Sequence, residues 1–205
     1  MNSFSSPRRG PKPNLNTRDN LIRAGLKTFH AQGFAATGLQ TIVAEASVPK
    51  GSFYNHFESK EAFGVEVIDA YSRLAEENLR AFLLNPELPT LERLEAFFDD
   101  RIASLTAGGY GRGCLMGNFS AEAADHSALI REHLEKNWNT WSQIFESCIA
   151  EGQLEGTITN RLPAVLLARF MFNSWEGALL RMRVEKSGAA LAEFKTVVLG
   201  ALLCP

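Results

Sequence analysis

The sequence predicts an all-α protein in which a small N-terminal three-helix unit precedes a larger helical bundle. Three observations lead to this fold class. Apolar residues recur at helical spacing along most of the chain, whereas the alternation typical of strands is nearly absent. Gly, Pro and Ser residues interrupt the pattern at intervals that suit helices. An apolar fraction of 45% is sufficient for a full core in a chain of 205 residues.

The chain begins with a stretch that has no helical pattern. Residues 1–16 are rich in Ser, Pro, Asn and basic side chains, so we expect a flexible basic arm. From Thr17 the pattern becomes helical. Thr17 can cap a first helix, and Gly33 is expected to end it.

Two short helices complete the N-terminal unit, which we place at residues 17–63. The first of them follows Thr37 and ends where Ser-Val-Pro interrupts the pattern at 47–49. The second carries Phe53 and Phe57 on one face and is otherwise dense in polar residues. Two short amphipathic helices separated by a tight turn have the shape of a helix-turn-helix.

The remainder of the chain, residues 64–205, is expected to form one helical bundle. Ser59 can cap a long fourth helix that runs to about Leu84 and joins the two parts. A Gly-rich loop at 108–113 separates two later helices. The later helices are expected to begin at 90 and then to span about 116–124, 127–152, 163–186 and 189–203.

Charge is distributed unevenly along the chain. Residues 1–60 hold eight Lys or Arg and three Asp or Glu, a charge of +5, whereas the rest of the chain has a charge of −7. A basic module beside an acidic one suggests that the basic part meets an anion, and nucleic acid is the first candidate.

Several classes of protein do not fit the sequence. Three cysteines, Cys114, Cys148 and Cys204, are odd in number and widely spaced, which indicates neither a disulfide framework nor a zinc module. We find no secretory signal and no apolar run of about 18 residues, so we expect a cytoplasmic protein without a membrane span. Phosphate loops, HExxH and GxSxG are absent, so we expect no enzyme, no metal and no cofactor.

Residues 38–63 carry the most specific signal in the chain. They resemble the signature of the TetR family of transcriptional regulators, and two positions depart from it: Ser47 stands where the family usually has Gly, and Pro49 where it usually has Ser. The matching positions are Thr37, Ile42, Ala46, Val48, Gly51, Phe53, Tyr54, His56, Phe57, Ser59, Lys60 and Glu61.

The resemblance implies a homodimer that places two recognition helices on a palindromic operator in double-stranded DNA. Lys50 and Asn55 are expected to contact base edges, and Tyr54, His56 and Lys60 to contact phosphates. The basic arm is expected either to lie in the minor groove or to contact nothing. The full set of expected DNA-binding residues is Thr37, Gln40, Thr41, Lys50, Gly51, Ser52, Tyr54, Asn55, His56 and Lys60.

Two C-terminal motifs, RGCLMGN at 112–118 and WEGA at 175–178, resemble the branch of the family that responds to acrylate and other electrophiles. This resemblance implies a repressor that is released by an inducer, either an electrophile or a small carboxylate, or by modification of Cys114. A thiol at a helix N-terminus can have a lowered pKa, although most free cysteines are buried apolar groups. The expected ligand or sensor residues are Cys114, Asn118, Trp138, Phe172, Trp175, Glu176 and Arg181.

Some alternatives stay open at this point. Arg181 can pair with a carboxylate ligand or with Glu176. The last two helices carry apolar residues on more than one face, which indicates burial in a two-fold four-helix interface. We expect a ligand to act by shifting the segment 108–124, which would move the fourth helix and the DNA-binding units. An architectural DNA-binding protein without an inducer is the alternative function.

Overall fold

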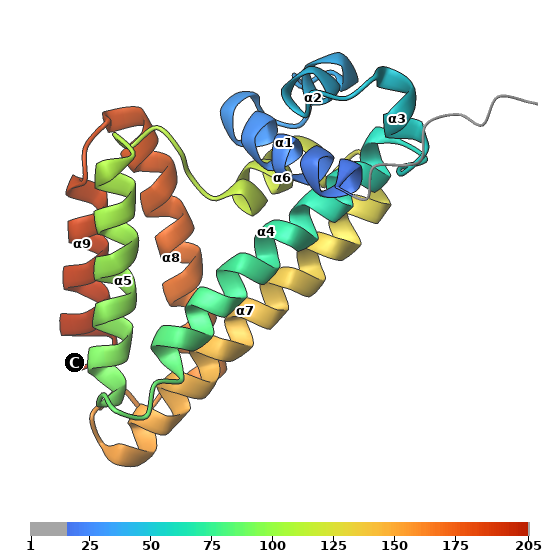
Figure 1. Ribbon diagram of the computed structural model, residues 1–205. Helices are drawn as coiled ribbons and strands as arrows, with labels where there is room; N and C mark the ends of the chain where they lie inside the picture. The colour runs from blue at the N-terminus through green and yellow to red at the C-terminus, as the bar shows by residue number, and fades with distance from the viewer. Residues whose placement is uncertain (1–15, 205) are drawn as a thin grey trace, which may run out of the picture.

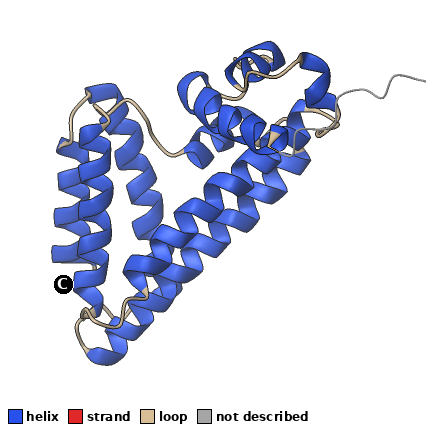
Figure 2. Ribbon diagram, in the orientation of Figure 1, coloured by secondary structure: helices blue, strands red, loops and turns tan. Residues whose placement is uncertain are grey.

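A computed structural model describes residues 16–204, so the predicted arm lies outside the described residues except for Asn16. Within residues 16–204 the chain is helical and has no strand, which confirms the predicted fold class (Figure 2). Two long helices, α4 (Lys60–Leu83) and α7 (Ala128–Glu155), lie side by side along the molecule (Figure 1). Three N-terminal helices, which we call the head, cover one end of this pair.

The head consists of α1 (Thr17–Gln32), α2 (Leu39–Glu45) and α3 (Lys50–Tyr54). Asn16 occupies the cap position of α1, so Thr17 is its first helical residue rather than the expected cap. Gly33 ends α1 as predicted, with a φ of 85° that favours glycine. The core of the head is built from completely buried side chains, the largest of which are Leu21, Phe29, Ile42, Phe53 and Phe63.

In the bundle, α7 packs against α4 and α8, and also contacts α5 and α6. The three helices α5, α8 and α9 lie beside one another away from the head (Figure 1), whereas the short α6 lies under α1. No helix in residues 16–204 is both long and apolar enough to cross a membrane. The remaining elements are α5 (Thr90–Ala107), α6 (Leu115–Ala123), α8 (Ala164–Glu185), α9 (Ala189–Val197) and a π-helical turn, η1 (Val198–Leu202).

Helix α4 belongs to both parts of the molecule. Ser59 caps it as predicted, because its hydroxyl accepts the Ala62 N–H at 3.0 Å. The helix packs on α1 near its start and then on α7 and α5. The predicted boundary between residues 63 and 64 lies inside this helix and stays a proposal.

The far end of α4 is held by a buried arginine from α5. The Arg93 guanidinium donates to the Leu83 carbonyl at 3.5 Å and to the Leu88 carbonyl at 2.7 Å. It also pairs with Glu151 of α7 at 3.0 Å. A charge with this many partners is compensated inside the fold, and it ties α4, α5 and α7 into one body.

The turn between α2 and α3 contains Ser47, one of the two positions at which the sequence departs from the family signature. Ser47 has a φ of 54°, in the left-handed region where a side chain costs about 1 kcal/mol. This conformation gives a physical reason for the glycine that the family usually has at this position.

We therefore predict that Ser47→Gly stabilises the protein by about 0.5–1 kcal/mol. Glycine relieves the strain of the positive φ, and the greater conformational entropy of glycine in the unfolded chain offsets part of this gain. Thermal unfolding at fixed protein concentration measures this as a rise of about 2 °C. Ser147→Gly, in the exposed interior of α7, is the control and should lower stability instead. A lower melting temperature for Ser47→Gly would contradict the strain.

Candidate nucleic-acid interface and ligand cavity

Helix α3 presents polar side chains on the surface of the head. Lys50, Tyr54 and Asn55 are exposed, whereas Phe53 and Phe57 are buried in the core. The aromatic pair therefore fixes which side of α3 faces solvent, as the sequence predicts. A short helix with a free polar face at the end of the molecule is suited to the major groove.

The other expected DNA-binding positions differ in exposure. Gln40 and Gly51 are exposed, and Thr41, Ser52 and His56 are partly buried. No side chain or backbone atom lies within 4 Å of where a Cβ would stand at Gly51, so the surface is open at this point. These five positions keep their predicted role as a proposal.

The expected DNA-binding role of Thr37 is wrong. Its side chain is completely buried, and its hydroxyl donates to the Gly33 carbonyl at 2.6 Å. The hydroxyl thus closes the turn between α1 and α2, so it is not available to DNA. Burial of a polar group requires such a partner, which explains why a threonine stands here.

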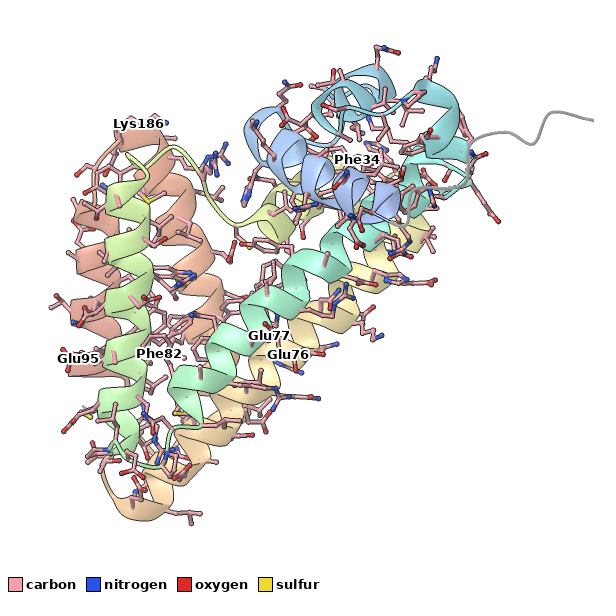
Figure 3. The ribbon with its side chains drawn as sticks, in the orientation of Figure 1. Phe34, Glu76, Glu77, Phe82, Glu95 and Lys186 are labelled. Carbon is pink, nitrogen blue, oxygen red and sulfur yellow. The ribbon has the colours of Figure 1, made fainter. Side chains whose placement is uncertain are left out.

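Lys60 already has partners within the protein. Its ammonium lies 4.5 Å from the centre of the Phe34 ring and 3.4 Å from the Ala35 carbonyl. Desolvation by burial lowers the pKa of Lys60, while the nearby Glu122 carboxylate raises it. Phe34 lies between the head and the bundle (Figure 3), so Lys60 supports this junction as well as standing at the expected phosphate position.

A cavity of about 130 Å³ lies in the bundle between α4, α5, α7 and α8. A cavity of about 150 Å³ in another protein holds benzene, so this one suits a molecule of similar size. Apolar and aromatic walls with few polar groups are typical of ligand sites. The lining includes Tyr71, Ala75, Asn78, Phe97, Arg101, Ser104, Cys114, Trp141, Phe172, Trp175 and Glu176.

A second hollow of about 450 Å³ lies between α6, α7 and α8. Trp138 lines this second hollow, and its indole N–H donates to the Ser120 hydroxyl at 3.3 Å. Phe172 and Glu176 line both spaces, so these two side chains form the partition between them.

Cys114 precedes α6 at the cap position, and its side chain is buried. Burial raises the pKa of the Cys114 thiol well above its usual value, and the nearby Glu176 carboxylate raises it further. The backbone N–H groups of Gly117 and Met116 at the start of α6 lower it, but less than burial raises it. The expectation of a lowered pKa is therefore wrong: the helix N-terminus is present, and desolvation outweighs it.

Glu176 accepts a hydrogen bond from the Cys114 side chain inside the bundle. Burial raises the pKa of Glu176 to about 7, and the hydrogen bond from Cys114 lowers it by a smaller amount. Tyr71 continues this cluster, since its hydroxyl is hydrogen-bonded to Cys114 and its pKa is also raised well above the usual value, chiefly by burial.

Two expected ligand residues, Arg181 and Asn118, line neither of the two cavities. The Arg181 guanidinium is exposed on α8 and donates to Glu185 at 2.6 Å, so of the two alternatives for Arg181 the pairing with Glu176 is wrong. The Asn118 side-chain oxygen accepts from Arg183 at 2.8 Å, which ties α6 to α8.

Comparison with known proteins agrees with this architecture. Residues 21–67 match the family described as bacterial regulatory proteins, tetR family, and residues 90–198 match the tetracyclin repressor-like C-terminal domain. The transcriptional repressor DhaR of Mycobacterium sp. strain GP1 is 41% identical over 91% of this chain and 92% of its own length. The chain belongs to the TetR family.

Further TetR-family proteins are similar along most of the chain. The transcriptional regulator AcuR of Cereibacter sphaeroides is 33% identical over 87% of this chain and 81% of its own length. The crystal structure of a regulatory protein TetR from Rhodobacter sphaeroides has a TM-score of 0.85 at 31% identity, covering 90% of this chain and 97% of that chain. The protein is accordingly a DNA-binding transcriptional regulator of the repressor type and not an enzyme.

In this TetR-family protein, short contacts join the head to the wall of the cavity. The His30 ring on α1 lies 3.1 Å from the Gly113 carbonyl, next to Cys114, and packs edge-on against Tyr71. On the other side of α6, Glu122 accepts the Ala35 N–H at 2.8 Å.

Sequence reasoning missed His30 and Tyr71 as site residues. Tyr71 follows Phe63 and Val67 on one side of α4, and a hydroxyl at the end of an otherwise apolar stripe was the available signal. Nothing in the sequence pairs His30 with Gly113, because these residues are 83 positions apart.

We predict that Lys50→Ala changes the relative affinity for different operators, with about 1–3 kcal/mol at the base pair that it contacts. Lys60→Ala should weaken binding to all sequences alike and lower the salt slope by about 1. Fluorescence anisotropy with an operator and its single-base variants, at several salt concentrations, measures both effects.

Arg161→Ala is the charge-matched control, because this exposed arginine precedes α8 and lies outside the head. Equal losses on every operator for Lys50→Ala would remove its assignment to a base edge.

Proposed function

We propose that this protein binds a palindromic operator as a homodimer in the cytoplasm and is released when a small molecule occupies the bundle cavity. One observation carries the proposal: α6 contacts the head through Glu122 near its C-terminal end, and Cys114 at its N-terminal cap position lines the cavity. A ligand in the cavity therefore touches the segment on which the head rests.

The expected route of the signal has contacts along its length. A ligand that displaces Cys114 also displaces Gly113, whose carbonyl meets His30 of α1. Movement of α6 would carry Glu122 and the bound backbone of Ala35 with it. The ligand can drive this change only if it binds the off-operator arrangement more tightly than the operator-bound one.

Dimerisation through α8 and α9 is supported by exposed apolar residues. Spaced four residues apart, Leu166 and Phe170 lie on one side of α8, with exposed fractions of 52% and 56%. Leu180 and Val184 continue along the same helix at 61% and 85%, and Val197 of α9 is exposed at 59%. An apolar stripe of this length is typical of a surface that a second subunit covers.

Reversible binding is better supported than covalent modification of Cys114. The thiolate is the reactive form, and burial beside Glu176 holds the thiol protonated at neutral pH. An electrophile that enters the cavity and reacts with Cys114 is the second candidate, favoured by the position of this thiol in the cavity wall.

To test release, the purified protein is bound to DNA upstream of its own gene at fixed salt, with a panel of small carboxylates, amines and electrophiles that includes acrylate and N-ethylmaleimide. We expect at least one compound to lower operator affinity about tenfold or more, within the usual range of allosteric coupling. Ala75→Phe, which fills the cavity from α4, should bind the operator and lose this response.

Cys114→Ser separates the two candidates in the same assay. Release that persists in Cys114→Ser supports a reversible ligand, and release that is lost together with a mass shift on Cys114 supports covalent sensing. Operator binding that no compound alters, in wild type and Ala75→Phe alike, would favour the architectural alternative.

We predict that Phe170→Glu converts the dimer into a monomer and lowers operator affinity by at least about tenfold, because it places a charge in an apolar interface. Light scattering during size-exclusion chromatography measures the mass. Leu154→Glu is the control, since Leu154 is 90% exposed on α7 and outside the stripe. If Phe170→Glu and Leu154→Glu both have the mass of a dimer, the interface does not include this part of α8.

A further inference from the structure

The cavity contains a carboxyl group without a cationic partner. Glu176 lines the cavity, and within residues 16–204 it forms no salt bridge. Its one polar contact of note is the hydrogen bond from Cys114, a neutral and weak donor. A carboxylate removed from water without a cation is costly, so this site is stabilised by a proton or by a positive charge.

Aromatic side chains line the same cavity as this carboxyl. Phe172 lies one turn before Glu176 on α8, and its ring centre is 5.9 Å from that of Trp141 on α7. The ring centre of Tyr71 on α4 is 6.1 Å from that of Trp141, and Trp175 also lines the cavity. The faces of aromatic rings attract organic cations, most strongly where water is excluded.

We propose that the cavity binds a small organic cation, a protonated amine whose ammonium pairs with Glu176 and whose apolar part lies against Phe172 and Trp141. The volume of about 130 Å³ limits the part of the ligand that the cavity encloses to about the size of one benzene ring. The inference rests on the proposed function, because it names the chemical class of the inducer.

The other charged group in the cavity wall does not compete for this role. Arg101 of α5 is the one cationic residue among those that line the cavity, and its guanidinium pairs with the neighbouring Asp100. Cys114 and Tyr71, the titratable groups beside Glu176, are held neutral by burial. Because Arg181 lies outside the cavity and Arg101 is paired with Asp100, a carboxylate ligand beside Glu176 would meet no unpaired cation among these lining residues.

Binding of a cation should depend on pH in a defined direction. Burial raises the pKa of Glu176 to about 7, so its ionised fraction rises from about 0.1 at pH 6 to about 0.9 at pH 8. An ammonium pairs with the ionised form, so its affinity should rise by about tenfold over this interval. A neutral ligand should show no such rise.

The test is isothermal titration calorimetry of the full-length protein without DNA, using benzylammonium, benzyl alcohol and benzoate. These probes share one ring and differ in charge. We expect benzylammonium to bind at least about tenfold more tightly than benzyl alcohol at pH 8, with benzoate the weakest, and to lose about tenfold in affinity at pH 6.

Glu176→Gln keeps the size of the side chain and removes its charge. It should lower the affinity for benzylammonium to that for benzyl alcohol and abolish the pH dependence. Glu185→Gln is the matched control, because this carboxyl is on the same helix and outside the cavity. Thermal unfolding shows that both variants are folded, and the pH dependence of the wild type tests the proposal without any variant.

Equal affinities for the three probes, tightest binding of benzoate, no binding at all, or an unchanged preference in Glu176→Gln would each overturn the proposal. Operator binding is measured separately, so the two proposals fail in different ways. A cation that binds but leaves the operator occupied contradicts release and supports this inference. A neutral compound that releases the operator, with no binding of benzylammonium, supports release and contradicts this inference.

Discussion

The contact between α6 and the end of α1 is the constraint on which the rest of the structure depends. Phe29, Phe34 and Phe119 pack together there with ring centres 5.0–5.4 Å apart, and Glu122 holds the Ala35 N–H beside them. The head is thus joined to the bundle both through this junction and through α4. Because packed aromatic cores deform poorly, we expect a change in the position of α6 to move the head as a rigid body.

The N-terminal end of α6, at the cavity, is held by buried polar groups and not by packed aromatic rings. Burial holds Cys114 and Tyr71 neutral, and the helix N-terminus that could have activated the thiol instead stabilises a hydrogen-bonded cluster. Such a cluster is costly when incompletely satisfied, so a ligand that gives Glu176 a better partner gains more than its apolar burial alone would provide. If the ligand is the proposed cation, the groups that keep the thiol protonated also make the cavity selective for charge.

Helix positions and the outward face of α3 could be predicted because they depend on local patterns. The spacing of Phe53 and Phe57, the cap at Ser59 and the stop at Gly33 are each decided within one or two helical turns. Contacts between distant residues could not be predicted in this way. Arg181 and Glu176 are five positions apart on α8, yet the nearer turn offers Glu185, and an i, i+4 pair is satisfied first. Thr37 matches the family signature, but its burial follows from packing that a motif does not reveal.

The strength of the junction sets the size of the response that the protein can give. Allosteric couplings are typically about 1–3 kcal/mol, and a hydrogen bond in a folded protein contributes about 1 kcal/mol. The His30–Gly113 contact alone is of this size, so its loss in one of two states would be sufficient for coupling while the Glu122–Ala35 bond moves with α6. Linkage then requires the operator to weaken ligand binding by the same factor by which the ligand weakens operator binding. Under the proposed function, a cation that pairs with Glu176 more strongly in the released state than in the operator-bound state would satisfy that requirement.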